Sequence, residues 1–462
     1  MGRGSTPRDY DNDEQYFHIT GSSKNNSITV FTADIKHVVD ITLDNVHIEL
    51  DTNNSALNLD TSSANVKLKG SNTLISRGIA NAAGIRITQG STGGYSYYLN
   101  IEGDSEDGFD SLTVRGGTGS AGIGGINPGN PLQQYLRTAG VITIRNCMVT
   151  AVGGLEAAGI GGADEGQGGT ITINGAIIDA RGGRMAAGIG DGYFMKPPGP
   201  ESRGAEIAIE KSIVEAFPGV FSGGRGPDNG PAILGKGIEI NNSLVNAVGH
   251  FTTRGSTNPL TAGIDCGEIT IDSSFVTAIG QPALRPNTVT LTATHYVKTN
   301  TAGADPGGDG KKFEEVEYEN NPNNRFVSFM LEPPENAIPA PEITGAQATS
   351  SRSVTLTFTN DDDVHDIEGY FVWCENTDAM AMVESGITNP ITTTITGLAP
   401  ATTYRFRVAA YTADDISPPS DAWVITTPES GGGGGGCDAG FGAMALLLIA
   451  VPCAARMSKK KR

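Results

Sequence analysis

The chain has few cysteines and few aromatic residues: five cysteines and 6 % aromatic side chains among 462 residues. It contains no CxxC pair and no cysteine–histidine spacing of the zinc-binding kind, which excludes a zinc module. The odd number of scattered cysteines also excludes a disulfide scaffold. No stretch of useful length shows the apolar periodicity of a helix, so we expect an all-β chain.

Positive charge is scarce as well, since 32 Lys and Arg residues oppose 51 Asp and Glu residues and the net charge is -19. A field of this sign repels phosphate backbones, which excludes nucleic acid as a partner. It suits solubility outside the cell. Residues 1–17 lack the apolar segment of a secretory signal peptide. Because the rest of the chain indicates export, we expect the export signal to lie upstream of this start.

Glycine is abundant, with 63 residues, but it follows no G-X-Y period, so collagen is excluded. The glycines instead punctuate an internal repeat of the form "ITI…VTA.GG", whose copies begin roughly every 30 residues, a spacing typical of solenoids. The copies begin at Ile142, Ile171, Ile207, Ile238 and Ile269. A second element, "AAGIGG" and its variants, begins at Ser120, Ala157, Ala186 and Thr261.

Each repeat contains three short strands bounded by Gly, Asn or Asp. Both isoleucines of "ITI" point to one face, because side chains alternate along a strand. Three such strands per turn predict a right-handed parallel β-helix over residues 1–295, with like side chains stacked about 4.8 Å apart. Cys147 and Cys266 then lie roughly 20 Å apart along the stack, too far for a disulfide.

This coil pattern resembles that of bacterial surface β-helix proteins with "ITI…VTA.GG…AAGIGGG" coils, over about residues 100–280. The resemblance implies the fold and says little about a ligand. Related modules bind carbohydrate, so the resemblance implies glycan binding as an alternative function.

The sequence after the repeat divides into a cap and a second domain. We expect residues 296–338 to cover the open end of the β-helix and to continue as a proline-rich linker. Residues 339–428 resemble the fibronectin type III family. Within "GLAPATTY", Tyr404 takes the place of the tyrosine-corner residue, and Phe358 stands where the family usually has a core tryptophan. The resemblance implies a spacer or adhesion module without a catalytic role.

The repeat contains four acidic residues that are candidates for a metal or glycan site, and they follow the "AGIG" element. These candidates are Asp164, Glu165, Asp191 and Asp265. Asp164 and Asp191 are expected on neighbouring coils, where they would hold Ca²⁺ for an acidic glycan or act as paired carboxylates in hydrolysis. The alternative is that aspartate beside glycine only forms turns. Because no basic column and no calcium-loop spacing accompanies them, we expect no enzyme and no cofactor, with Ca²⁺ as the alternative.

Three insertions rich in Gly and Pro interrupt the repeat, and in solenoids such insertions usually gather on the binding face. The aromatic side chains of these insertions could pack against a sugar ring. The alternative is that they only cover the core. These aromatic residues are Tyr135, Tyr193, Phe194 and Phe251.

The C-terminal tail follows a Gly-rich linker at residues 429–438. Residues 439–462 begin with about 17 uncharged residues, about 25 Å as a helix, and end in a basic cluster. This order predicts a transmembrane helix with the bulk of the chain outside the cytoplasm. The run "GCDAGFGA" resembles the Synerg-CTERM sorting domain, over about residues 431–462. That resemblance implies an exported bacterial protein processed by a sorting protease, with Cys437 at the site of processing and lipid attachment.

The sequence therefore predicts a non-catalytic cell-surface protein, held in the membrane by its tail, that acts as an adhesion, structural or ligand-presenting β-helix. A surface carbohydrate-binding module, with or without Ca²⁺, is the alternative. A β-helical polysaccharide lyase or hydrolase is a further alternative.

Overall fold

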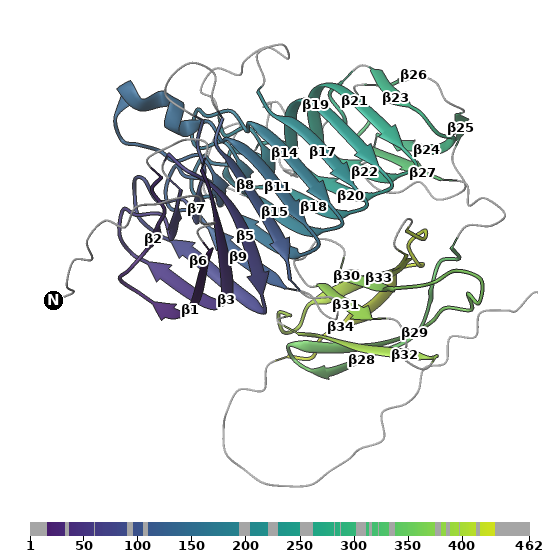
Figure 1. Cartoon of the computed structure of the whole chain (residues 1–462). Helices are drawn as coiled ribbons and strands as arrows, with labels where there is room; N and C mark the ends of the chain where they lie inside the picture. The colour runs from purple at the N-terminus through teal and green to yellow at the C-terminus, as the bar shows by residue number, and fades with distance from the viewer. Residues whose placement is uncertain are drawn as a thin grey trace, which may run out of the picture.

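The computed structural model describes most of residues 16–429, and almost all of its elements are β-strands (Figure 1). The residues outside the described part are 1–15, 33–36, 60, 90–95, 105–109, 194–203, 220–229, 250–261, 281, 287, 302–310, 314–316, 322, 332–337, 375–379, 385–388, 397, 413–415 and 430–462. The described strands up to Met330 belong to one 27-stranded sheet, and those from Glu342 onward form two further sheets of three and four strands.

The 27-stranded sheet is folded into three walls, and within each wall a strand pairs in parallel with the strand one repeat further along. The first wall contains β1 (Tyr16–Ser23), β3 (Val38–Leu50), β5 (Ser63–Lys69), β8 (Tyr98–Gly103), β11 (Val141–Arg145), β14 (Thr170–Asn174), β17 (Glu206–Glu210), β19 (Ile233–Asn241), β21 (Ile264–Asp272) and β23 (Thr288–Leu291). The second wall contains the end of β3, then β6 (Ser71–Ser76), β9 (Ser111–Arg115), β12 (Met148–Val152), β15 (Ile177–Arg184), β18 (Ile213–Gly219), β20 (Leu244–Val248) and β22 (Phe275–Ile279). The third wall contains β2 (Ile28–Thr29), β4 (Leu57–Asn58), β7 (Ile85–Arg86), β10 (Ile123–Gly124), β13 (Ile160–Gly161), β16 (Ile189–Gly190) and the starts of β19 and β21.

Three stacked parallel strands per repeat agree with the coils that the sequence predicts. The isoleucines of successive copies occupy equivalent positions, with Ile142 beside Ile171 and Ile144 beside Ile173 in the first wall. In the third wall Ile123 lies beside Ile160. All six side chains are fully buried, so the repeated isoleucines form the core of this coil domain.

The corner between the first and second walls needs a left-handed backbone in most coils. Asn146, Lys211 and Asn242 adopt φ values of 49°, 47° and 44° there. The corner after the second wall needs glycine because successive coils lie too close together there for a side chain. A Cβ placed on Gly183 would lie 1.5 Å from the carbonyl oxygen of Gly154 in the preceding coil. The "GG" of the repeat therefore allows the coils to approach closely at this corner.

Antiparallel strands cover the C-terminal end of the coil domain. These strands are β24 (His295–Asn300), β25 (Lys311–Phe313), β26 (Glu317–Glu319) and β27 (Phe326–Met330). Strand β27 pairs with the last strand of the second wall, and β26 pairs with the last strand of the first wall. Tyr318 packs edge-to-face against Phe329, with ring centroids 5.5 Å apart, and so closes the core. This segment overlaps the cap expected from residue 296 onward.

The insertion after Gly124 contains a short 3-10 helix, η1 (Pro131–Arg137), where the sequence indicates only a loop. Leu136 is buried with Ala83 and Ile126 in a small cluster of its own. The amide of Ile126 donates a hydrogen bond of 2.9 Å to the carbonyl oxygen of Leu136. One buried leucine and this backbone bond therefore hold η1 against the third wall.

The C-terminal domain is a sandwich of two antiparallel sheets. One sheet contains β28 (Glu342–Ser350), β29 (Ser353–Thr359) and β32 (Ile391–Thr396). The other contains β31 (Met380–Glu384), β30 (Gly369–Cys374), β33 (Thr403–Tyr411) and β34 (Trp423–Thr426), in that order. Phe358 is fully buried between them and packs against Tyr370, with ring centroids 5.2 Å apart. Phe358 therefore fills the core position where the family resemblance leads us to expect a tryptophan.

The predicted transmembrane helix within residues 439–462 and Cys437 lie outside the described residues. Within the part of the chain that the structure describes, no helix is long and apolar enough to cross a membrane.

Candidate functional site

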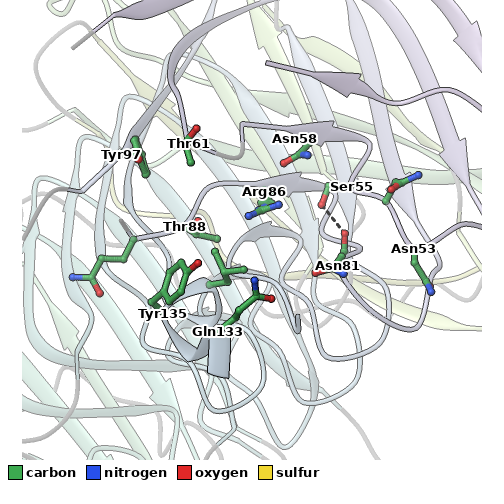
Figure 2. Close-up of a pocket in the computed structure, with 13 residues that line it drawn as sticks. Asn53, Ser55, Asn58, Thr61, Asn81, Arg86, Thr88, Tyr97, Gln133 and Tyr135 are labelled. Atoms are coloured by element: carbon green, nitrogen blue, oxygen red, sulfur yellow. Dashed lines mark hydrogen bonds between the residues drawn. The ribbon is translucent and has the colours of Figure 1, made fainter. Parts of the chain in front are cut away.

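A polar cleft of about 500 Å³ lies on the N-terminal half of the coil domain, between the third wall and η1 (Figure 2). Thirteen residues line it: Asn53, Asn54, Ser55, Asn58, Thr61, Asn81, Arg86, Thr88, Gln89, Tyr97, Gln133, Tyr135 and Leu136.

The third wall provides Asn58 and Arg86 to the cleft. The two residues are register partners on β4 and β7, and their neighbours Leu57 and Ile85 are fully buried in the core. Because side chains alternate along a strand, burying Leu57 and Ile85 directs Asn58 and Arg86 outward. Their side chains lie along one side of the cleft in Figure 2. Stacking of the coils therefore places an amide and a guanidinium side by side.

The opposite side of the cleft comes from η1. Buried Leu136 fixes this helix, and its neighbour Tyr135 is 36 % exposed. Gln133 lies beside Tyr135 and faces the same space (Figure 2). The insertion thus presents one aromatic ring and one amide across from the third wall.

Hydrogen bonds order the rim of the cleft near the start of β4. The Ser55 hydroxyl donates to the carbonyl oxygen of Asn81 at 3.1 Å, the contact drawn dashed in Figure 2. The side-chain oxygen of Asn53 accepts a bond of 2.8 Å from the Ile79 amide. Asn81 adopts φ 53°, and its amide donates to the carbonyl oxygen of Asn127 at 2.8 Å. These bonds tie the rim residues to two successive coils.

At the other end of the cleft, the backbone of β7 runs on toward the insertion. Thr88 forms an antiparallel bridge with Ala139, and the Gln89 amide donates to the carbonyl oxygen of Thr138 at 3.0 Å. Tyr97 is half-buried and packs against the coil core. The cleft therefore has one partly exposed tyrosine on each side of it.

The chemistry of the cleft differs from that of the whole chain. The chain carries a net charge of -19, yet the described lining contains one guanidinium and no carboxylate. Amides and hydroxyls both donate and accept hydrogen bonds, and tyrosine rings offer flat apolar faces. A cleft of this size with convergent polar groups is suited to a polyhydroxylated ligand. Arg86 also makes it suited to an anionic one.

The acidic residues singled out in the sequence lie elsewhere, and two of them serve the fold. Asp191 is fully buried, and its carboxylate accepts hydrogen bonds from the amides of Gly168 at 2.7 Å and Gly204 at 3.3 Å. Asp265 is buried and forms an ion pair with Arg285. Both carboxylates therefore connect neighbouring segments of the coils.

Asp164 and Glu165 lie beside Arg137 at the end of η1. One guanidinium nitrogen of Arg137 donates to the carboxylate of Glu165 at 2.6 Å and to the carbonyl oxygen of Asp164 at 3.2 Å. Burial, and after it the negative charge of Glu156, raise the pKa of Asp164 to about 6, while Arg137 acts in the opposite direction.

Asp164 and Asp191 lie on neighbouring coils, as expected, because they follow the paired strands β13 and β16. No group of three or more His, Cys, Asp or Glu residues suited to a metal ion occurs among the residues that the structure describes. The physical reason is that backbone amides hold Asp191 and a separate arginine holds Asp265. The backbone contacts of Asp191 are those that the turn interpretation describes.

Of the aromatic residues expected in the insertions, Tyr135 lines the cleft. Tyr193 lies beside the Asp164 turn instead, where its backbone bonds to Glu156 and Glu165. Phe194 and Phe251 lie outside the described residues. Sequence reasoning missed the other lining residues, because they come from irregular N-terminal coils whose outward side chains follow no repeat.

In the C-terminal sandwich, Tyr404 forms the contact expected of a tyrosine corner. Its hydroxyl oxygen accepts a hydrogen bond of 2.6 Å from the Ala399 amide, and the hydroxyl also reaches the Ala399 carbonyl oxygen at 3.4 Å. Phe406, Val408 and Ala410 alternate into the sandwich core from the same strand.

Comparison with known proteins identifies this sandwich. The fibronectin type III family model matches residues 339–426. Similar solved structures include the fibronectin type III domain of the human KIAA0970 protein, at 20 % identity over 22 % of this chain and 88 % of that chain, with a TM-score of 0.18. The fn3 domain of human contactin 1 is 23 % identical over 20 % of this chain and 79 % of that chain, with a TM-score of 0.17. The FN5 domain of Drosophila Lar is 22 % identical over 20 % of this chain and 100 % of that chain, also with a TM-score of 0.17. No curated protein matches the chain. Residues 339–426 form a fibronectin type III domain.

Proposed function

We propose that this protein is a non-catalytic, surface-displayed protein whose parallel β-helix binds a glycan in the cleft between the third wall and η1. The observation that carries the proposal is the composition of that cleft. One guanidinium, several amides and hydroxyls, and two tyrosines converge on about 500 Å³.

In this proposal each group of lining residues has a role. Tyr97 and Tyr135 provide apolar faces for the C–H face of a sugar ring. Asn58 and Gln133 exchange hydrogen bonds with sugar hydroxyls, since an amide both donates and accepts. Arg86 binds a uronate carboxylate or a hydroxyl pair through its planar donors. The proposal assigns no role to Ca²⁺ at the cleft.

The same composition argues against catalysis at the cleft. Hydrolysis of a glycosidic bond uses two carboxyl groups at a defined separation, and the described lining provides none. The proposal therefore assigns glycan binding, and no cleavage of the glycan, to the cleft.

Surface display is proposed from the domain content and the tail sequence. Fibronectin type III domains are generic extracellular modules, and such a domain is present here. The apolar run within residues 439–462, the basic cluster after it and Cys437 make up the proposed membrane and sorting signal. Fractionation of the host cell tests this part: Cys437→Ser is expected to change processing or membrane attachment, and unchanged processing and attachment would refute the role of Cys437.

The glycan proposal is tested on the full chain with a glycan array, followed by calorimetric titration of the glycans retained. Tyr135→Ala is expected to weaken binding about tenfold or more, as expected when an aromatic anchor is lost. Tyr16→Ala is the matched control, because Tyr16 is an exposed tyrosine at 61 % on the first wall, outside the cleft. Binding is expected to persist in EDTA. The cleft would be refuted as the binding site if the array retained no glycan, or if the two tyrosine variants weakened glycan binding equally.

A further inference from the structure

An apolar column runs along the outside of the second wall. Its members are register partners on five successive coils: Met148, Ile177, Ile213, Leu244 and Phe275. Each precedes a residue that points into the coil core, so alternation directs the column outward. An outward position normally faces water, yet Ile177, Ile213 and Leu244 are 3 %, 1 % and 6 % exposed. Something covers this side of the wall.

The column has a sharp end. The register partner of Met148 in the preceding coil is Ser111, and that of Ser111 is Ser71. Both serines are polar, so the apolar part of the wall covers five coils, or roughly 19 Å by the strand spacing. This length is similar to that of one strand of six residues, which spans roughly 20 Å.

The fibronectin type III domain presents a matching apolar face. Strand β30 is buried at all six positions. Tyr370, Val372 and Cys374 point into the sandwich core, whereas Phe371 and Trp373 point away from it. The sequence "GYFVWC" is thus a continuous apolar run in an antiparallel strand, which indicates that both faces of the strand are covered.

The two faces meet in one apolar cluster, separate from the cores of the coil domain and of the sandwich. Phe371, Trp373, Ala409 and Ile416 pack there with Ile177, Ile213 and Leu244, and Met148, Phe275 and Tyr411 lie at its edge. Phe371 also stacks on Tyr411, with ring centroids 4.3 Å apart. Figure 1 shows β30 and β33 next to the wall that contains β18 and β20.

We infer that this cluster is a permanent joint, so that the fibronectin type III domain is a fixed support of the coil domain. The spacer role implied by the family resemblance is therefore replaced by a docked role. Separation of the domains would expose Trp373, Phe371 and three aliphatic side chains to water at once, and the hydrophobic cost of that exposure keeps the joint closed. The cover for the apolar column is thus another part of the same chain.

The joint has a consequence for partners. The outer face of the sheet that contains β30 and β33 is occupied, so an external protein is not expected to bind there. The cleft lies in the N-terminal coils, away from the five coils of the column. Docking therefore holds the cleft in one orientation relative to the sandwich without covering it.

The joint is tested by cutting the connection between the domains in the intact, folded chain. Residues 332–337 are replaced by a site for a specific protease, the full chain is purified in detergent, and the cut protein is passed over a size-exclusion column. The two halves are expected to elute together at micromolar concentration. Separate elution of the unsubstituted halves would overturn the inference, and so would a dimer before cutting, since the joint would then form between copies.

Two variants and a control locate the contact. Leu244→Glu alters only the outer side of a coil, and Trp373→Glu alters the sandwich side; each is expected to weaken reassociation of the halves about tenfold or more, which corresponds to roughly 1.4 kcal/mol. Val424→Glu is the control, because Val424 lies on the same sheet but is 53 % exposed. Circular dichroism of the uncut variants shows whether each domain is folded. Reassociation that is as tight with Leu244→Glu, in a folded chain, as without it would overturn the inference.

Discussion

The amide of Ser212 donates a hydrogen bond of 3.1 Å to the hydroxyl oxygen of Ser243 in the next coil. The amide of Ser243 makes the same bond to the hydroxyl of Ser274 at 3.0 Å, and the Ala176 amide bonds to the Ser212 hydroxyl at 3.2 Å. All three serines are buried at the corner between the first and second walls. This serine ladder pairs corner amides that would otherwise be buried without an acceptor.

Removal of one step of the ladder is expected to destabilise the coil domain. Ser243→Ala leaves the buried Ser212 amide without its acceptor, which costs about 1–3 kcal/mol. Urea unfolding followed by circular dichroism measures the loss. Thr113→Ala, at an exposed position on β9, is the control and is expected to change stability by less than about 0.5 kcal/mol. Equal effects of the two substitutions would show that the ladder adds nothing.

The coil core could be predicted from the sequence because it repeats. Ile142, Ile171 and Ile207 occupy one register position, as the alignment of "ITI" copies requires. Strand alternation then determines which side faces the core, since a slip by one residue would turn every isoleucine outward. The same alternation contains the signal for the joint: in the five second-wall strands from β12 to β22, the first residue is apolar and points outward, as at Ile213. That signal was missed because only the inward positions were considered.

The cleft could not be predicted in the same way. Asn58 and Arg86 become neighbours only through the pairing of β4 and β7, which consist of two residues each and follow irregular spacing. Tyr135 reaches the cleft because buried Leu136 fixes η1, and nothing in the insertion's sequence specifies that contact. The sequence also cannot separate the two interpretations of the acidic residues. A buried aspartate that binds backbone amides, such as Asp191, has the same sequence neighbours as one that binds a ligand.

The tyrosine corner provides a test within the fibronectin type III domain. Tyr404→Phe removes the hydroxyl that accepts a bond from the Ala399 amide, and the expected cost is about 1–2 kcal/mol, in the range for a buried hydrogen bond. Thermal unfolding of the full chain, followed by tryptophan fluorescence, measures it because both tryptophans lie in this domain. Thr392→Ala, at an exposed position on β32, is the control. A Tyr404→Phe variant as stable as the parent would show that the corner is dispensable.

Cys147, one of two described cysteines in the coil core, is expected to be chemically inert. Cys147 is 1 % exposed, and burial raises the pKa of its thiol to about 12. The thiolate is the nucleophile, so iodoacetamide at pH 8 should leave Cys147 unmodified in the native protein and modify it fully in urea. Peptide mapping by mass spectrometry distinguishes Cys147 from the other cysteines. Modification in the native state at a rate close to that in urea would show that the coils open readily at this position.

The carboxyl group of Asp164 predicts a pH dependence of stability. Its pKa is raised from 3.8 to about 6, first by burial and then by the negative charge of Glu156. A raised pKa in the folded state means that the protonated form favours folding. The stability from this group is therefore fully present below pH 3.8 and is lost as the pH rises through about 6.

Asp164→Asn removes that dependence, since the amide stays neutral at every pH. We expect the variant to exceed the parent in stability by about 1 kcal/mol at pH 7.5, a figure reduced for solvent screening at this half-buried turn, and to match it near pH 4. Urea unfolding at both pH values measures the difference. Glu239→Gln, at an exposed position on the first wall, removes the same charge and is the control. If Glu239→Gln stabilises the protein equally at pH 7.5, the effect comes from lowering the net charge of -19 and the buried-carboxyl explanation is wrong.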